Sequence, residues 1–144
     1  MTRKTDKHHD RQAGFTLLEL LVVLGIIALL AALVAPQVIR YLSDARSSTA
    51  NAQLKNIESA VELYYLDNGR YPSTESGLAD LVTAPAGVAG WKGPYLKKKQ
   101  GLVDPWGKPF VYTFPGAHGS YDIVSLGRDG KEGGEGEDRD LVSW

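Results

Sequence analysis

The chain has 144 residues, of which 43% are hydrophobic and 23% charged, and a formal net charge of −1 at pH 7. This length fits one domain plus a membrane segment, and the absence of a clustered basic face disfavours nucleic-acid binding. There is no cysteine, so a small extracytoplasmic domain built from this chain must be stabilised by something other than disulfides.

The first 35 residues combine a basic leader with an apolar segment. Residues 1–14 hold four Lys or Arg and two Asp, a net charge of +2, which leaves −3 on the rest of the chain. Residues 15–35 contain one charged residue, Glu19, and are about the ~20 residues that a helix needs to span a bilayer. A carboxylate in such a segment costs about 2.5–3.5 kcal/mol on insertion scales, which makes Glu19 a candidate functional residue.

Three kinds of N-terminal segment fit this pattern. A cleaved secretory signal is disfavoured because the apolar run is longer than usual and Pro36 directly follows its small-residue site. A plain signal anchor would keep the basic flank in the cytoplasm. The third possibility is a prepilin-type signal, cut on the cytoplasmic side between Gly14 and Phe15, which leaves the apolar helix on the mature protein.

Residues 14–19 have the sequence GFTLLE. This motif resembles the class III signal of type IV pilins and type II secretion pseudopilins. The resemblance implies that prepilin peptidase cuts after Gly14 and that Phe15 becomes an N-methylated terminus. It also implies that Glu19 pairs with the N-terminal amine of a neighbouring subunit during assembly. Such a pair would neutralise two charges, each of which is costly alone in a low-dielectric setting.

Helical periodicity resumes beyond Pro36. Apolar residues recur at the spacing of one helix face: Leu54, Ile57, Val61 and Tyr64. Because proline can kink a helix without ending it, we expect one helix from about Phe15 to Leu66, with two helices meeting at Pro36 as the alternative. Asn68 and Gly69 are typical of residues that follow a helix end.

The middle of the chain predicts a short helix, an irregular loop and a hairpin. Ser73 or Thr74 is a candidate N-cap for a short helix through Leu81. Residues 83–108 are rich in proline and glycine, and their aromatic residues can pin this loop to the long helix. Two segments rich in β-branched and aromatic residues, 110–114 and 121–125, predict an antiparallel hairpin. The expected fold class is therefore α+β.

Residues 126–140 hold five glycines and six carboxylates and almost no apolar residue. Two interpretations are open on composition alone. The segment could be a solvated acidic tail, or it could be a calcium loop whose flexible backbone supplies hard oxygen ligands. It is not an EF-hand, because residues 129–133 lack the required ligand spacing.

Residues 125–134 have the sequence SLGRDGKEGG, followed later by Asp-Leu and a terminal Trp. They resemble the C-terminal signature of the major pseudopilins of type II secretion, the general secretion pathway protein G family, in which this loop binds calcium. The ligands implied by the resemblance are the carbonyl of Leu126 and the side chains of Asp129, Asp138, Asp140 and, more weakly, Ser125. Glu135 and Glu137 stay open as alternatives, because loop spacing varies. Calcium would then take the place of the missing disulfide.

The expected protein is a major structural subunit of a type II secretion pseudopilus, with no catalytic residues. Three parts are predicted: a cleaved leader (1–14), a membrane-spanning and filament-core helix (15–35) and a periplasmic domain (36–144). The resemblance implies as partners other copies of the chain, minor pseudopilins, prepilin peptidase and the inner-membrane secretion platform. The alternatives are a type IV or competence pilus subunit and, remotely, a membrane-anchored periplasmic enzyme with paired carboxylates.

Overall fold

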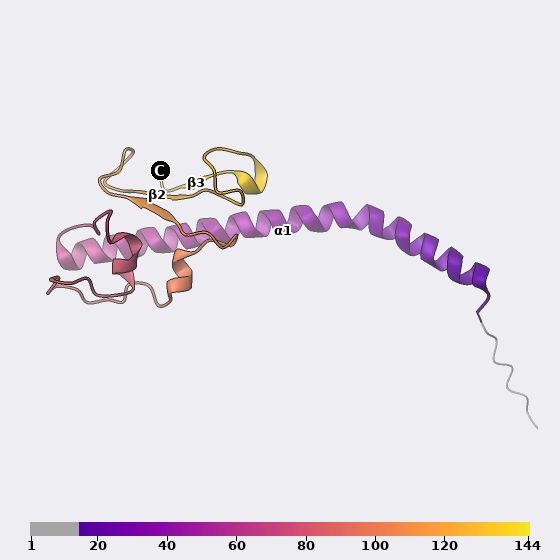
Figure 1. The fold of residues 1–144 in the computed structure, drawn as a ribbon, viewed down its shortest axis with the longest axis horizontal. Coiled ribbons are helices and arrows are strands. Elements are labelled where there is room, and N and C mark those ends of the chain that lie inside the picture. Colours follow the sequence, from indigo (N-terminus) through magenta and orange to yellow (C-terminus); the bar gives the residue numbers. More distant parts are fainter. Residues whose placement is uncertain (1–14) are drawn as a thin grey trace, which may run out of the picture. The chain divides into compact units, whose positions relative to one another are not determined.

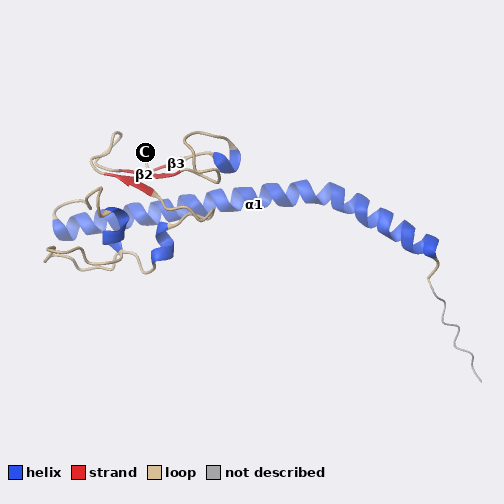
Figure 2. Cartoon of the chain, in the orientation of Figure 1, coloured by secondary structure: helices blue, strands red, loops and turns tan. Residues whose placement is uncertain are grey.

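The structure, a computed structural model, describes residues 15–144 (Figures 1 and 2). These residues divide into two units, one ending at Ile39 and the other comprising Arg40–Trp144. Helix α1 (Leu17–Asn68) runs through the division and contains Pro36. The predicted continuation of one helix past Pro36 is confirmed, and the alternative of two helices is wrong.

Local chemistry defines both ends of α1. The backbone N–H of Glu19 donates to the hydroxyl of Thr16 at 3.3 Å, so Thr16 caps the first turn and Glu19 occupies the third helical position. This is a capping-box spacing. At the other end Gly69 adopts a φ of 67°, the left-handed conformation that glycine allows after a helix.

The second unit has its own hydrophobic core, built on one face of α1. The predicted stripe is confirmed, because its side chains are all at most 1% exposed: Leu54, Ile57, Val61 and Tyr64. They pack against Leu81 of the short 3-10 helix η1 (Gly77–Leu81) and against the sheet residues Tyr112 and Ile123. Each such aliphatic or aromatic side chain contributes about 1.5–3 kcal/mol by leaving water.

Three short antiparallel strands lie in the order β1-β2-β3. The predicted hairpin is confirmed as β1 (Val111–Thr113) and β2 (Asp122–Ser125), with Tyr112 opposite Ile123. The C-terminal segment returns as β3 (Leu141–Val142) and adds to the free edge of β2. The three strands and the loop before β3 gather over the second half of α1 in Figure 2.

The segment between α1 and the sheet is irregular but well tied down. Tyr95 donates its hydroxyl hydrogen to Asp67 at 3.0 Å and packs edge-on against Tyr64. Trp91 Nε1 donates to the carbonyl of Asp80 at 2.8 Å. The predicted pinning of this loop by aromatic residues is therefore confirmed. Two further 3-10 helices, η2 (Lys99–Leu102) and η3 (Gly136–Asp138), lie in the segments around the sheet.

Candidate functional site

The first candidate site is the apolar half of α1. Every large apolar residue from Leu17 to Leu42 is between 45% and 82% exposed. Within residues 15–144, α1 is the one helix long and apolar enough to cross a membrane, by length and composition. A helix that is apolar on all sides is stable only when lipid or other protein surrounds it. This half of α1 therefore needs a covering that residues 15–144 do not supply.

Glu19 is the single acidic residue of that apolar segment, and it lies exposed in the first turn of α1. A carboxylate there is stabilised by the positive end of the helix dipole. The position of Glu19 in the first turn of the helix thus gives its carboxylate a local stabilisation that does not depend on any neighbouring subunit. Phe15 is 78% exposed at the start of the described chain. The predicted cleavage residue Gly14 lies outside the described residues.

The second candidate site is the acidic C-terminal loop, residues 126–140, whose start and end are joined by a backbone hydrogen bond. The backbone N–H of Arg128 donates to the carbonyl of Glu137 at 2.8 Å. Gly127 makes this approach possible, because a Cβ there would lie 2.7 Å from that carbonyl oxygen, and its φ is 60°. The loop is therefore closed by its own backbone, while most of the residues between these ends are exposed to solvent.

Three of the predicted calcium ligands line or border this closed loop. The carbonyl of Leu126 accepts from the N–H of Gly130 at 3.1 Å, and Asp129 Oδ1 accepts from the N–H of Lys131 at 3.1 Å. Asp140 Oδ2 accepts from the N–H of Gly133 at 2.9 Å. Its other oxygen, Oδ1, is buried and has no hydrogen-bond partner among the described residues.

The other two predicted ligands are already engaged elsewhere. Both oxygens of Asp138 accept from the guanidinium of Arg128, each at 2.9 Å. The hydroxyl of Ser125 donates to Asp104 Oδ2 at 2.7 Å. Asp138 and Ser125 could reach a metal ion only by leaving these partners.

The donor set of the loop fits a calcium ion better than a transition metal. Across residues 15–144 there is no cluster of three or more His, Cys, Asp or Glu side chains that could hold a metal. A site here must therefore combine one or two carboxylates with backbone carbonyls and water, which is a combination that Ca²⁺ accepts. The buried oxygen of Asp140 that has no hydrogen-bond partner among residues 15–144 is a group that such an ion would satisfy.

Asp140 and Leu126 also line a hollow of about 430 Å³ on the face of the sheet turned away from α1. The ring of His118 stacks on Trp144 at 3.8 Å between centroids, and His118 Nδ1 lies 3.1 Å from Asp122 Oδ2. Burial acts to raise the pKa of Asp122, but hydrogen bonds from Ala117 and His118 outweigh it and hold the pKa below its ordinary value. His118 is thus an exposed residue of the hairpin tip, and its ring contacts the C-terminal Trp144.

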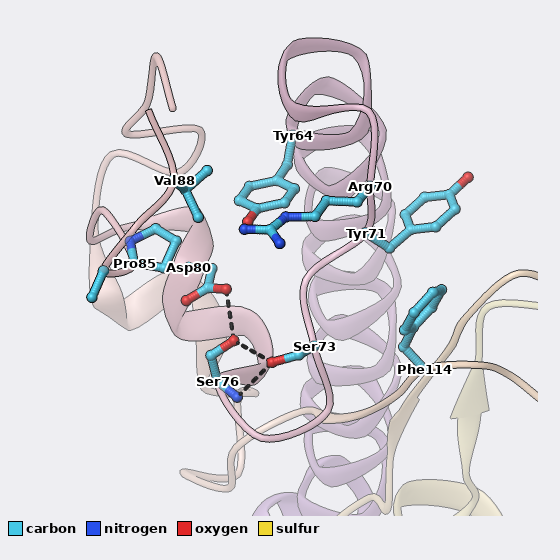
Figure 3. Close-up of a pocket in the computed structure, with 10 residues that line it drawn as sticks. Tyr64, Arg70, Tyr71, Ser73, Ser76, Asp80, Pro85, Val88 and Phe114 are labelled. Carbon is cyan, nitrogen blue, oxygen red and sulfur yellow. Dashed lines mark hydrogen bonds between the residues drawn. The ribbon is translucent and has the colours of Figure 1, made fainter. Parts of the chain in front are cut away.

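A second hollow, of about 460 Å³, lies between the end of α1 and η1 (Figure 3). Its polar side is built by Ser76, which donates to the buried carboxylate of Asp80 at 2.6 Å. Arg70 extends across it toward Tyr64, and Phe114 forms the opposite wall (Figure 3). The carboxylate is thus already paired inside the protein, and the hollow shows no arrangement typical of a nucleophile with its base.

Comparison with known proteins identifies the family. Residues 37–144 match the family described as "Type II secretion system (T2SS), protein G". This chain belongs to that family. In addition, residues 9–35 match the prokaryotic N-terminal methylation motif. The family decides between the two filament classes in favour of the pseudopilin, so the chain is a major pseudopilin of type II secretion.

Individual relatives agree with this assignment over nearly the whole length. Type II secretion system core protein G of Pseudomonas aeruginosa is 47% identical over 138 residues, covering 93% of this chain and 96% of the relative. The Vibrio cholerae protein of the same name is 39% identical, covering 96% and 95%. The crystal structure of the major pseudopilin of enterohaemorrhagic Escherichia coli is similar with a TM-score of 0.59 and 32% identity, covering 70% of this chain and 88% of that one.

Proposed function

We propose that the chain is cut by prepilin peptidase after Gly14, held in the inner membrane by residues 15–35, and polymerised into a periplasmic pseudopilus that drives export of folded proteins. The observation that supports this most is the contrast between the two parts of α1. The first is apolar on every side and exposed throughout, while the second is one wall of a closed core. A subunit built this way can exchange lipid for neighbouring helices without unfolding its soluble part.

Assembly, and not catalysis, is the activity we infer. In the filament Glu19 would pair with the amine of Phe15 in a neighbouring subunit, so that both charges are neutralised as they enter an apolar interior. This pairing also fixes register, because a helix that is apolar on all sides could otherwise slide along its neighbours. Minor pseudopilins and the inner-membrane platform are the further partners of this proposal.

The test is filament formation in cells that overproduce the chain together with prepilin peptidase. Filaments are sheared from the cells and imaged by electron microscopy. We expect filaments from the wild type and from the control Glu75→Ala, which removes an exposed acid of the soluble unit. Glu19→Ala should give membrane-bound subunits without filaments, and Glu19→Asp should retain part of the yield. Abundant filaments from Glu19→Ala would contradict the proposed role of Glu19.

We also propose that the C-terminal loop binds one calcium ion. The ligands of this proposal are the carbonyl of Leu126 and the carboxylates of Asp129 and Asp140. It is supported most by the buried oxygen of Asp140, which has no hydrogen-bond partner among residues 15–144. When bound, the ion would supply a divalent charge that draws these oxygens together. Because β3 begins directly after Asp140, the same contact would fix the C-terminal strand on the sheet.

Thermal melting of the full chain in detergent tests the calcium site. The wild type should melt at least several degrees higher with millimolar calcium than with chelator, since ligand that binds only the folded state stabilises it. Asp140→Asn should melt at the same temperature in both, and the control Glu75→Gln, which changes an exposed acid outside the loop, should respond like the wild type. A wild-type midpoint that does not change with calcium would refute the metal site and leave the filament proposal standing.

A further inference from the structure

Arg128 joins the two ends of the C-terminal loop by both its backbone and its side chain. Its N–H donates to the carbonyl of Glu137 at 2.8 Å. Its guanidinium donates through Nε and Nη2 to the two oxygens of Asp138, each at 2.9 Å. The remaining nitrogen, Nη1, lies 3.3 Å from Glu137 Oε2. One side chain therefore holds two consecutive acids that lie nine and ten residues further along the chain.

The burial of this cluster distinguishes it from an ordinary surface ion pair. The side chain of Arg128 is 58% exposed, but those of Glu137 and Asp138 are only 13% and 28% exposed. Isolated exposed ion pairs contribute little, whereas a two-point arginine–carboxylate pair fixes geometry as well as charge. Hydrogen bonding to Asp138, followed by its negative charge, raises the pKa of Arg128 above its ordinary value.

The cluster also reaches α1. Arg46 Nη1 lies 3.5 Å from Glu137 Oε1, so Glu137 lies between an arginine of the helix and an arginine of the loop. Removing Glu137 would leave Arg46 without this ion pair, and removing Arg128 would leave the largely covered carboxylate of Asp138 without its two-point partner. The cluster thus connects the loop both to itself and to the helix that carries the core.

We infer that Arg128 is a positioning residue that closes the C-terminal loop without metal, and that Asp138 stays bound to Arg128 rather than becoming a calcium ligand. We call Arg128, Glu137 and Asp138 the guanidinium clamp. It holds η3 against the start of the loop, so that Asp140 and Leu126 line the same hollow before any ion arrives. The clamp does not depend on calcium binding, because all of its contacts are within the chain.

The clamp is tested by melting the full chain in detergent with excess chelator. Arg139→Ala is the matched control: Arg139 lies in the same loop, is exposed, and makes no ion pair within residues 15–144. We expect Arg128→Ala to melt at least about 4 °C below Arg139→Ala, a shift typical of ~1 kcal/mol in a domain of this size. Arg128→Lys should recover less than half of that loss, since an ammonium cannot form the two-point contact.

A double-mutant comparison separates the clamp from a general effect of charge. Asp138→Ala should lower the midpoint as Arg128→Ala does, and the double variant should lower it little further, because both single changes remove the same contact. Equal midpoints for Arg128→Ala and Arg139→Ala, or fully additive losses in the double variant, would overturn the clamp.

Calcium titration by calorimetry tests the second half of the inference. Asp138→Asn should change calcium affinity by no more than about threefold, whereas Asp140→Asn should lower it by at least about tenfold, because charged ligands set calcium affinity. A loss in Asp138→Asn as large as that in Asp140→Asn would overturn the assignment of Asp138 to the clamp. If the wild type binds no calcium, the calcium proposal fails and the melts in chelator alone decide whether the clamp exists.

Discussion

The hydroxyl of Ser125 donates a 2.7 Å hydrogen bond to Asp104 Oδ2, and the two residues are 0% and 4% exposed. The other oxygen of Asp104 accepts from the backbone N–H groups of Trp106 at 3.1 Å and Lys108 at 2.8 Å. One carboxylate thus shapes the turn before β1 and attaches it to the end of β2. Asp104 thus connects the turn that contains Pro105 to the sheet.

Replacing Asp104 should therefore be among the more destabilising single changes in the soluble unit. We expect Asp104→Ala to lower the free energy of unfolding by about 3 kcal/mol, because it removes charge-assisted hydrogen bonds and leaves buried donors unpaired. Asp104→Asn should cost less, since its carbonyl oxygen can still accept from the backbone. Denaturant unfolding in detergent measures both, with the exposed Asp44→Ala as the control. Equal stability of Asp104→Ala and Asp44→Ala would show that the pairing with Ser125 contributes nothing.

Asp122 should make stability depend on pH in the acidic range. Burial acts to raise the pKa of Asp122, but hydrogen bonds from Ala117 and His118 lower it by more than burial raises it. The pKa in the folded state therefore lies below the ordinary value of 3.8. Its contribution is therefore present in full above the unfolded pKa and is lost as the pH falls through the folded pKa. Between pH 7 and pH 3 the melting midpoint of the wild type should fall more than that of Asp122→Asn. Parallel curves for the two proteins would contradict this.

The core on α1 offers a comparison between two positions of one helix. Ile57 is fully buried and Leu66 is 75% exposed. Ile57→Ala should lower the free energy of unfolding by about 2–5 kcal/mol, because it removes buried methyl groups and leaves a cavity. Leu66→Ala should stay within about 0.5 kcal/mol of the wild type, as surface changes usually do. Denaturant unfolding distinguishes the two, and similar losses would mean that the helix face has been assigned incorrectly.

Two loop glycines separate backbone strain from steric overlap. Gly127 and Gly133 both have positive φ, 60° and 90°, but only Gly127 has neighbours where a Cβ would lie. Both alanine variants should therefore lose about 1 kcal/mol through backbone strain. Gly127→Ala should lose about a further 1–3 kcal/mol, because its Cβ would meet the carbonyl of Glu137. Thermal melts in chelator measure the difference between the two alanine variants. Equal midpoints would show that the close approach of Gly127 to Glu137 contributes nothing to stability.

The sequence was sufficient for the elements that local patterns specify. The stripe through Ile57 and Tyr64 predicts which face of α1 is buried, because helical spacing alone brings those residues together. The hairpin of β1 and β2 follows in the same way from two β-rich segments separated by a short turn. The motif at residues 14–19 likewise indicates the class of protein without any tertiary information.

The C-terminal loop shows where such patterns stop being sufficient. Its composition predicts oxygen ligands but does not say which acids are free, since that depends on pairing with distant groups. Asp138 and Asp140 look equivalent in the sequence. Yet Asp138 binds Arg128, whereas one oxygen of Asp140 has no hydrogen-bond partner within the described part of the chain. Ser125 lies on the buried face of β2. There its hydroxyl bonds to Asp104, which lies 21 residues earlier in the chain. These assignments required the tertiary structure. The predicted boundaries after residues 14 and 35 stay predictions.

The most direct test of the account is the intact mass of the subunit recovered from sheared filaments. If the chain is a processed pseudopilin, the filament fraction should contain one species that begins at Phe15 and carries one additional methyl group. A filament subunit that keeps residues 1–14, or the absence of the chain from the filament fraction while it accumulates in the membrane, would contradict the account.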